Sequence, residues 1–188
     1  MSEFRGAYQF STTEGSIKKT LEKFKDQILR KQDEKIATTS RKELDIFLTK
    51  TETTSKMIRN IIVELKRPSI NLGKNELDQI KEYMRIVLDE PSCNGNKMQW
   101  TFYLIGCKYN QIVEDEIESH KSSGDERDGL VHIMKGGSAK LYVQKWTDII
   151  NVNQKSKYSF LQEKLKIELE KLDNYSSQEV TEEIIGSK

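Results

Sequence analysis

Three charged residues are spaced so that they could act together on a phosphate group. Asp45 lies in a short apolar stretch, Glu64 lies near the end of the next one, and Lys66 follows two positions later. Side chains at positions i and i+2 of a strand project from the same face. A hairpin between the two stretches would bring Asp45 to that face as well. The spacing therefore predicts two carboxylates and an ammonium group on one face of a sheet.

Two carboxylates in apolar strands repel each other unless a cation joins them, and this favours a divalent metal. Mg²⁺ takes oxygen ligands and retains several waters, so Asp45, Glu64 and the backbone carbonyl of Leu65 would suffice to hold it, and Mn²⁺ could substitute. Such a metal can polarise a phosphate and acidify a bound water. Lys66 can orient that water or stabilise negative charge on phosphorus.

A second explanation of the pattern stays open. Charged residues make up 32% of the chain, so an aspartate followed by a Glu-x-Lys motif also arises by chance. Glu64 and Lys66 would then form a solvated pair at a strand end, which adds little stability. The spacing alone does not decide between the two explanations.

The segment after Lys66 carries three more residues suited to phosphate chemistry. Arg67 follows directly, and its planar guanidinium matches a phosphate better than an ammonium group would. Gln79 and Tyr83 are four positions apart, so they share one face of a helix. The glutamine could bond a phosphate or a metal-bound water, and the tyrosine could stack or bond nearby. In the alternative, Tyr83 is a half-buried anchor and Arg67 a surface charge.

The elements that must position these residues begin with a helix and two strands. Residues 15–33 have apolar positions at helical spacing, which predicts an amphipathic helix. The stretch at 44–48 is rich in strand formers, and the polar residues 49–56 suit a hairpin turn. A second strand over 57–66 has β-branched residues at its centre. Pro68 ends it, because proline has no N–H to give a sheet.

The rest of the chain completes an α/β fold, with a central mixed sheet flanked by helices. Asn75 is expected to cap a helix that runs to Leu88, and residues 99–105 form a buried strand parallel to its neighbour. Gly136-Gly137 is expected to form a hairpin turn between two further strands. The remaining predicted segments are a helix at 110–119, strands at 130–134 and 139–144, and helices at 146–155 and 157–173.

Composition limits the environment and the partners of the chain. The 31 basic and 30 acidic residues provide no bulk positive field, so any phosphate-binding surface must come from local clustering. Cys93 and Cys107 lack zinc-ligand spacing and a disulfide framework. No apolar run approaches the length of a membrane span, and the polar start resembles no signal peptide. We therefore expect a soluble, cytoplasmic protein that does not bind membranes.

Several of these motifs together resemble a known group of enzymes. Residues 63–68, Val-Glu-Leu-Lys-Arg-Pro, followed by Gln79-x-x-x-Tyr83, resemble the PD-(D/E)xK nuclease superfamily and its RecB-like QxxxY branch. Residues 41–48 resemble the aspartate-bearing strand of that superfamily, although no proline precedes Asp45. More narrowly, residues 100–106, 141–146 and 160–165 resemble the C-terminal domain of bacterial histidine-kinase-like (HSP90-type) ATPases, which is similar to a domain of Shedu-type antiphage nucleases.

The resemblance implies a restriction-endonuclease-like core and a Mg²⁺-dependent endonuclease that hydrolyses DNA in antiphage defence or restriction. Asp45 and Glu64 would be metal ligands, Lys66 the catalytic lysine, and Gln79 and Tyr83 supporting residues. We expect one domain over residues 15–173, an N-terminal extension over 1–14 and a flexible tail over 174–188. The expected partner is DNA, and the chain could also form a homo-oligomer or work with a partner ATPase or sensor domain.

Members of this superfamily often carry another acidic residue in the first helix. Glu14, at the expected start of that helix, and Glu22, within it, are both candidates, and Glu14 is slightly favoured. The same helix bears Lys18, Lys19 and Lys23, which could follow a phosphate backbone or simply form a solvated face. A different class of function also fits the chain: a catalytically silent module that binds nucleic acid, docks onto a partner or oligomerises through its last helices.

Overall fold

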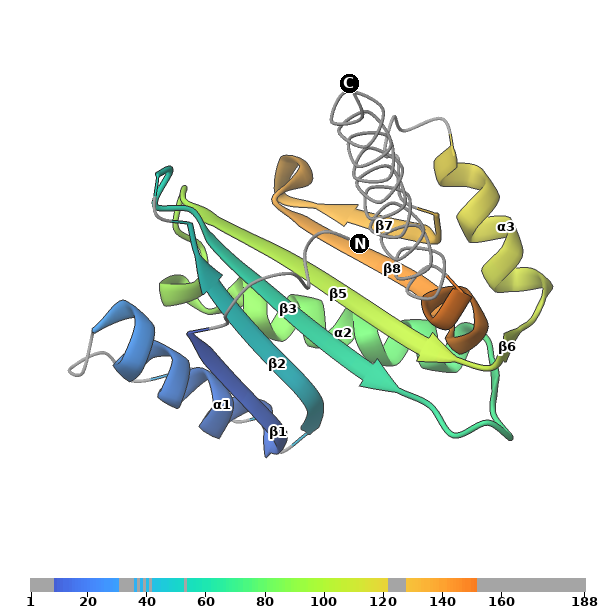
Figure 1. Ribbon diagram of the computed structural model, residues 1–188, viewed down its shortest axis with the longest axis horizontal. Coiled ribbons are helices and arrows are strands. Elements are labelled where there is room, and N and C mark those ends of the chain that lie inside the picture. The colour runs from blue at the N-terminus through green and yellow to red at the C-terminus, as the bar shows by residue number, and fades with distance from the viewer. Residues whose placement is uncertain are drawn as a thin grey trace, which may run out of the picture. The chain divides into compact units, whose positions relative to one another are not determined.

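The computed structural model describes residues 9–30, 36, 38, 40, 42–52, 54–121 and 128–151, with the side chains of Phe10, Thr13 and Glu14 excepted. The chain divides into two compact units, residues 1–146 and 147–188. Within the described part of the first unit, six strands form one mixed sheet in the order β1-β2-β3-β5-β8-β7 (Figure 1). Helices pack against this sheet, so the predicted α/β class with a mixed sheet flanked by helices is confirmed.

The hairpin that was expected to hold the charged residues is present. Strands β2 (Glu43–Thr51) and β3 (Ile58–Leu65) pair in antiparallel fashion, from Thr51 opposite Ile58 to Ile46 opposite Val63. The Glu52 N–H donates to the Met57 carbonyl at 2.9 Å and closes the predicted turn. Ile61, Ile62 and Val63 are all buried, although their side chains alternate between the two faces of the sheet. This explains why the strand reads as an unbroken apolar run.

Helix α2 (Lys74–Asp89) connects β3 to β5 (Met98–Gly106), and β5 runs parallel to β3, as predicted. The predicted cap at Asn75 is wrong. Gly73 is the cap residue, and the Glu76 carboxylate accepts a hydrogen bond from its N–H at 2.9 Å. Only glycine fits there without rearrangement, because a Cβ at position 73 would lie 2.7 Å from the Asn110 side-chain nitrogen.

Two short parallel strands next to the ends of β3 and β5 were not predicted. They are β4 (Asn71–Leu72) and β6 (Lys108–Tyr109). Two-residue strands carry no periodicity that could reveal them in the sequence. They hold the segment after Lys66 against the segment after Gly106, and so fix the loop that leads into α2. A 3-10 turn, Pro91–Cys93, follows α2.

The second half of the sheet agrees with the prediction. Strand β8 (Ala139–Lys145) runs parallel to β5, and β7 (Leu130–Met134) pairs with it in antiparallel fashion. Gly136 and Gly137 turn the chain between them with φ of 62° and 97°. Helix α3 (Gln111–His120) begins after Asn110, whose side chain caps it. Residues 146–151 are helical, and the predicted helix at 157–173 lies outside the described residues.

The N-terminal prediction needs correction. Residues Phe10–Ser16 form an edge strand, β1, which pairs antiparallel with β2. Helix α1 (Ile17–Phe24) therefore starts two residues later than expected, and a π-helical turn, Lys25–Leu29, continues it. The Ser16 hydroxyl accepts a hydrogen bond from the Lys19 N–H at 3.4 Å and marks the start. Strand β1 was missed because its sequence, FSTTEGS, lacks alternating apolar residues.

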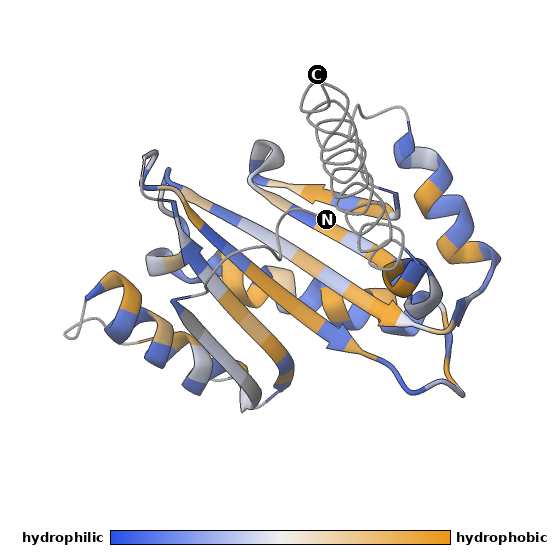
Figure 2. Ribbon diagram, viewed as in Figure 1, coloured by the Kyte–Doolittle hydropathy of each residue, from blue (hydrophilic) through white to orange (hydrophobic). Residues whose placement is uncertain are grey.

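An aromatic cluster between α1 and the sheet anchors the main core. Phe24 of α1 meets the rings of Phe47 and Trp100 edge-on, with centroids 5.5 and 5.9 Å away, and all three are buried. Figure 2 shows hydrophobic residues along the centre of β3 and hydrophilic ones just past its end. No helix among the described residues is long and apolar enough to cross a membrane. The charged candidates thus lie at the end of a central, apolar strand of the sheet.

Candidate active site

Asp45 occupies the point where β2 and β3 separate. The last pair between these strands is Ile46 opposite Val63. One step further, the Asp45 carboxylate oxygen Oδ2 accepts the Leu65 N–H at 2.6 Å, in place of a backbone partner. On the other side of β3, the Lys66 N–H donates to the Ile105 carbonyl of β5 at 2.8 Å. The sheet therefore holds the Asp45 carboxylate next to the end of β3.

The Leu65 carbonyl is available on the same side as Asp45. In an extended residue the N–H and C=O groups point to one side of the strand, and the Leu65 N–H points toward Asp45. This position lies beyond the last β2–β3 pair. The carbonyl can therefore serve as a third oxygen ligand beside two carboxylates.

Glu64 is buried, with 6% of its surface exposed. Its oxygen Oε1 accepts hydrogen bonds from the Lys66 ammonium at 2.8 Å and from the Gln79 side-chain nitrogen at 3.0 Å. Its other oxygen, Oε2, is buried and has no hydrogen-bond partner among the described residues. Burial raises the pKa of the Glu64 carboxyl above its usual value, and the nearby Asp45 charge adds to this while Lys66 opposes it.

Gln79 links the two charges at the end of β3 to helix α2. Its oxygen accepts from the Lys66 ammonium at 2.8 Å, and its nitrogen donates to Glu64 and to the Tyr83 hydroxyl, the latter at 2.7 Å. The orientation of this amide is fixed, because an ammonium group can face only an acceptor. The amide oxygen and both amide N–H groups of Gln79 then all form hydrogen bonds. The predicted sharing of one helical face by Gln79 and Tyr83 is present.

Tyr83 closes the network from the helix side. Only 3% of it is exposed, and burial raises the pKa of its phenol, so the hydroxyl stays protonated at neutral pH. The Lys42 ammonium lies 5.9 Å from the centre of the Tyr83 ring and forms an ion pair with Glu82. Lys42 was not singled out from the sequence. Its position three residues before Asp45 could have indicated it, because the chain there leads directly into β2.

Of the two acidic residues proposed for the first helix, the strand register favours Glu14. Its neighbours Thr13 and Gly15 face Ile46 and Leu44, so the Glu14 position is opposite Asp45. Glu14 thus belongs to strand β1 rather than to the helix start, and its side chain lies outside the described residues. Glu22 is half-buried in the second turn of α1, a helix that runs away from this edge.

The basic residues proposed to contact phosphates lie on two segments next to the start of β2 and the end of β3. Helix α1 begins there, because the Ile17 N–H donates to the Lys42 carbonyl at 2.8 Å. Lys18 is half-buried and Lys19 exposed in its first turn, whereas Lys23 is exposed further along. Arg67 is exposed directly after Lys66. The first turn of α1 therefore lies near the start of β2, and Arg67 directly follows Lys66 of the charged network.

A hard divalent cation fits the oxygen donors of this network. Among the described side chains, no group of three or more histidine, cysteine, aspartate or glutamate residues could hold a metal by itself. The predicted set adds the Leu65 carbonyl to Asp45 and Glu64, and its further candidate, Glu14, has a side chain outside the described residues. The unpaired Oε2 of Glu64 supports the fit, because a buried carboxylate oxygen without a partner is costly unless something binds it.

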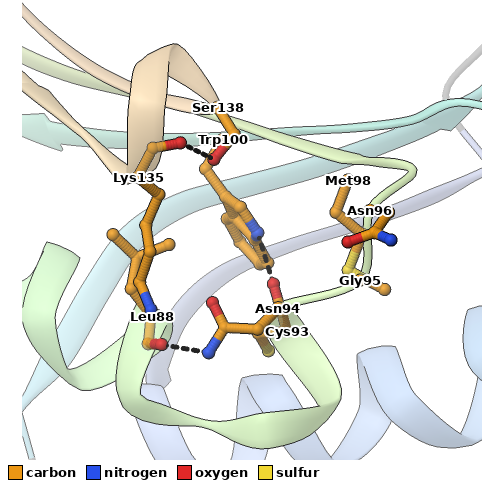
Figure 3. A pocket seen from close by; sticks show the side chains of 9 residues that line it. All are labelled: Leu88, Cys93, Asn94, Gly95, Asn96, Met98, Trp100, Lys135 and Ser138. Atoms are coloured by element: carbon orange, nitrogen blue, oxygen red, sulfur yellow. Dashed lines mark hydrogen bonds between the residues drawn. The ribbon is translucent and has the colours of Figure 1, made fainter.

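Cys93 and a recess that it lines lie away from this network. Cys93 is buried, and burial raises the pKa of its thiol to about 12, so it is unsuited to metal binding or nucleophilic attack. It lines a recess of about 600 Å³ between the end of α2, the start of β5 and the β7–β8 turn (Figure 3). None of the predicted site residues line this recess, which lies where β5 begins, whereas the network lies where β3 ends.

Comparisons with protein-family models, with curated proteins and with solved structures found no match to this chain. The fold and the site define an α/β protein whose mixed sheet carries a partly buried carboxylate–lysine–glutamine network at the end of the central strand β3.

Proposed function

We propose that this chain is a Mg²⁺-dependent nuclease that hydrolyses DNA phosphodiester bonds and belongs to the PD-(D/E)xK class, with a role in antiphage defence or restriction. The observation that carries the proposal is the Lys66–Glu64–Gln79 network beside Asp45. Its residue types and order along the chain agree with the motifs of that superfamily. A merely structural ion pair would not require Glu64 to be buried with one oxygen unpaired.

The metal would be held by Asp45, Glu64 and the Leu65 carbonyl, with Glu14 as a further candidate from β1. Mg²⁺ or Mn²⁺ bound there would polarise the scissile phosphate and acidify a bound water. The hydrolysis adds water across one P–O bond: the hydroxide becomes attached to phosphorus, and the departing oxygen receives a proton. The protein's own groups must orient that water and stabilise the charge that develops on phosphorus.

Lys66 is the group suited to this second task. Its ammonium is 2.8 Å from both Glu64 Oε1 and Gln79 Oε1, and its side chain is 18% exposed, so it is held in place yet still reachable. A positive charge fixed before the reaction needs no reorganisation when negative charge builds up. Gln79 positions this ammonium, and Tyr83 positions Gln79.

A cleavage assay tests the proposal. Purified protein with Mg²⁺ or Mn²⁺ is expected to cut plasmid or linear DNA, and Asp45→Ala or Lys66→Ala should lower the rate at least about a hundredfold. Asp78→Ala and Lys74→Ala serve as matched controls, because both residues are exposed on α2. Cutting at the wild-type rate by both site variants, with melting temperatures unchanged, would refute the assigned site.

The second candidate is a catalytically silent module that binds nucleic acid or docks onto a partner. It is favoured because, among the described side chains, no three histidine, cysteine, aspartate or glutamate residues lie together as a metal-binding group. The two functions differ in their response to metal. A cation that binds the folded state raises the melting temperature by mass action. The nuclease should therefore melt higher in Mn²⁺ than in chelator, whereas a silent module should melt at the same temperature in both.

A further inference from the structure

A second group of charged side chains lies on the other flank of α2. Lys81 follows Gln79 by two positions, which is about 200° around the helix. Lys81 and Arg85 are one turn apart on this flank. Lys81 pairs with Glu116 of α3, and Lys81, Arg85, Glu116 and His120 all act electrostatically on His132 of β7. We call these five residues, Lys81, Arg85, Glu116, His120 and His132, the histidine cluster.

Three elements bring the histidine cluster together. Figure 1 shows α3 alongside the β7–β8 end of the sheet, and α2 beneath the sheet. Glu116 and His120 are one turn apart on α3. The Lys81 ammonium is 3.5 Å from a Glu116 carboxylate oxygen, which is longer than a good charge-assisted hydrogen bond. Lys81 therefore remains able to bind another anion.

The histidine rings have nitrogens to offer as well. His120 Nδ1 lies 2.9 Å from the Glu116 backbone carbonyl and 3.0 Å from the Ser119 hydroxyl, so this ring nitrogen is engaged within α3. Its Nε2 is then the nitrogen that a ligand would meet. The chain contains only two histidines, and both belong to this cluster.

The histidine cluster has an excess of positive charge. Lys81 and Arg85 outnumber the single acid, Glu116, even when both histidines are neutral. The pKa of His132 is accordingly lowered, first by burial and then by Lys81, His120 and Arg85, and only Glu116 opposes them. A bound anion would relieve this repulsion. A phosphate suits the cluster best, because it can accept from a guanidinium, an ammonium and imidazolium groups at once.

We propose that the histidine cluster is a binding site for a phosphate group, separate from the proposed active site. The phosphate could belong to a nucleic-acid backbone or to a small phosphate compound, and both present the same oxygen atoms. Glu116 acts within it as a competing acid. This assignment does not depend on DNA cleavage, because binding here requires neither the metal nor Asp45, Glu64 and Lys66.

Binding is measured by calorimetry with two probes, inorganic pyrophosphate and a short DNA duplex, in chelator so that no cleavage occurs. Lys81→Met and Arg85→Gln should each lower the affinity for whichever probe binds by about tenfold, as expected for one lost charge-assisted hydrogen bond. Glu116→Gln should strengthen it, since the competing charge is removed. Lys74→Met, an exposed lysine on the same helix, should change nothing. Pyrophosphate binding with duplex indifference identifies a small-phosphate site, and the reverse identifies a backbone contact.

A second readout comes from the histidines themselves. Ring NMR signals should show that the bound probe raises the pKa of His132, because the anion favours the charged imidazolium. Binding should thus be tighter at about pH 6 than at about pH 8. The proposal is overturned if neither probe binds, if Arg85→Gln and Lys81→Met bind as tightly as the wild type, or if Glu116→Gln weakens binding. None of these outcomes bears on the nuclease, which the Asp45 and Lys66 variants test.

Discussion

The Glu64 side chain shows how a candidate catalytic residue can reduce the stability of the fold that holds it. Its pKa is raised chiefly by burial, so the ionised form is less stable in the folded protein than in the unfolded chain. The neutral Glu64 carboxyl favours the folded state, and its contribution to the free energy of unfolding is fully present at a pH below the usual glutamate pKa. It is lost as the pH rises through the raised value in the folded protein. At neutral pH, an ionised Glu64 therefore lowers the free energy of unfolding.

Glu64→Gln should consequently raise the melting temperature at about pH 7 while abolishing cleavage. The introduced amide keeps an oxygen for Lys66, and the Gln79 oxygen remains 2.8 Å from the same ammonium. The advantage of the variant should shrink as the pH falls through the raised pKa, because wild-type Glu64 then becomes neutral. Thermal melts across this pH range measure the effect. Asp78→Asn, at an exposed position on α2, is the control. A lower melting temperature for Glu64→Gln at every pH would contradict the argument.

At the scale of the elements, the loop after Lys66 depends on a close contact between two strands' ends. A Cβ at Gly106 would lie 2.9–3.0 Å from three side-chain carbons of the buried Leu72. Gly106→Ala should therefore destabilise the protein by about 1–3 kcal/mol. In a Leu72→Ala background, the same substitution should cost almost nothing, because the three carbons are gone. Denaturant titrations of the four proteins give this coupling directly.

Gly95→Ala is the matched control for Gly106→Ala. A Cβ there would meet Met98 at an ordinary distance of 3.6 Å, and Gly95 is exposed, so its free energy of unfolding should change by less than about 0.5 kcal/mol. Equal costs for Gly106→Ala in both Leu72 backgrounds would show that the contact does not hold this loop.

The elements that could be predicted from the sequence are those with a strong period. The apolar runs of β3 and β5 and the stripe of α2 identified the hairpin and the crossover that bring Asp45, Glu64 and Gln79 together. Strand β1 and the β4–β6 pair could not be predicted, because they are polar or only two residues long. The Asp45–Leu65 hydrogen bond could not be predicted either, since it depends on the residue at which the pairing of β2 with β3 ends. Glu14 was proposed from a resemblance, and only the register of β1 places it opposite Asp45.

For the whole molecule, the near balance of charge limits how DNA could bind. A formal net charge of +1 gives little long-range attraction, so affinity must come from a few local phosphate contacts. The candidates at the proposed site are Lys18, Lys19, Lys23 and Arg67. Each true phosphate contact contributes about 0.9 to the slope of log affinity against log salt concentration. A small slope is therefore expected for the wild-type protein with duplex DNA in chelator.

Arg67→Gln should reduce that slope by about 0.9 and weaken binding to all sequences alike, because a phosphate contact reads no bases. Lys97→Gln removes an exposed charge just before β5, at the end of the strands opposite to the network. It should leave the slope unchanged. Fluorescence anisotropy at several salt concentrations measures both. If the two variants had the same slope as the wild type, Arg67 would not contact a DNA phosphate. If Lys97→Gln alone reduced the slope, the DNA path would lie at the opposite end of the strands, and the network around Glu64 would be out of its reach.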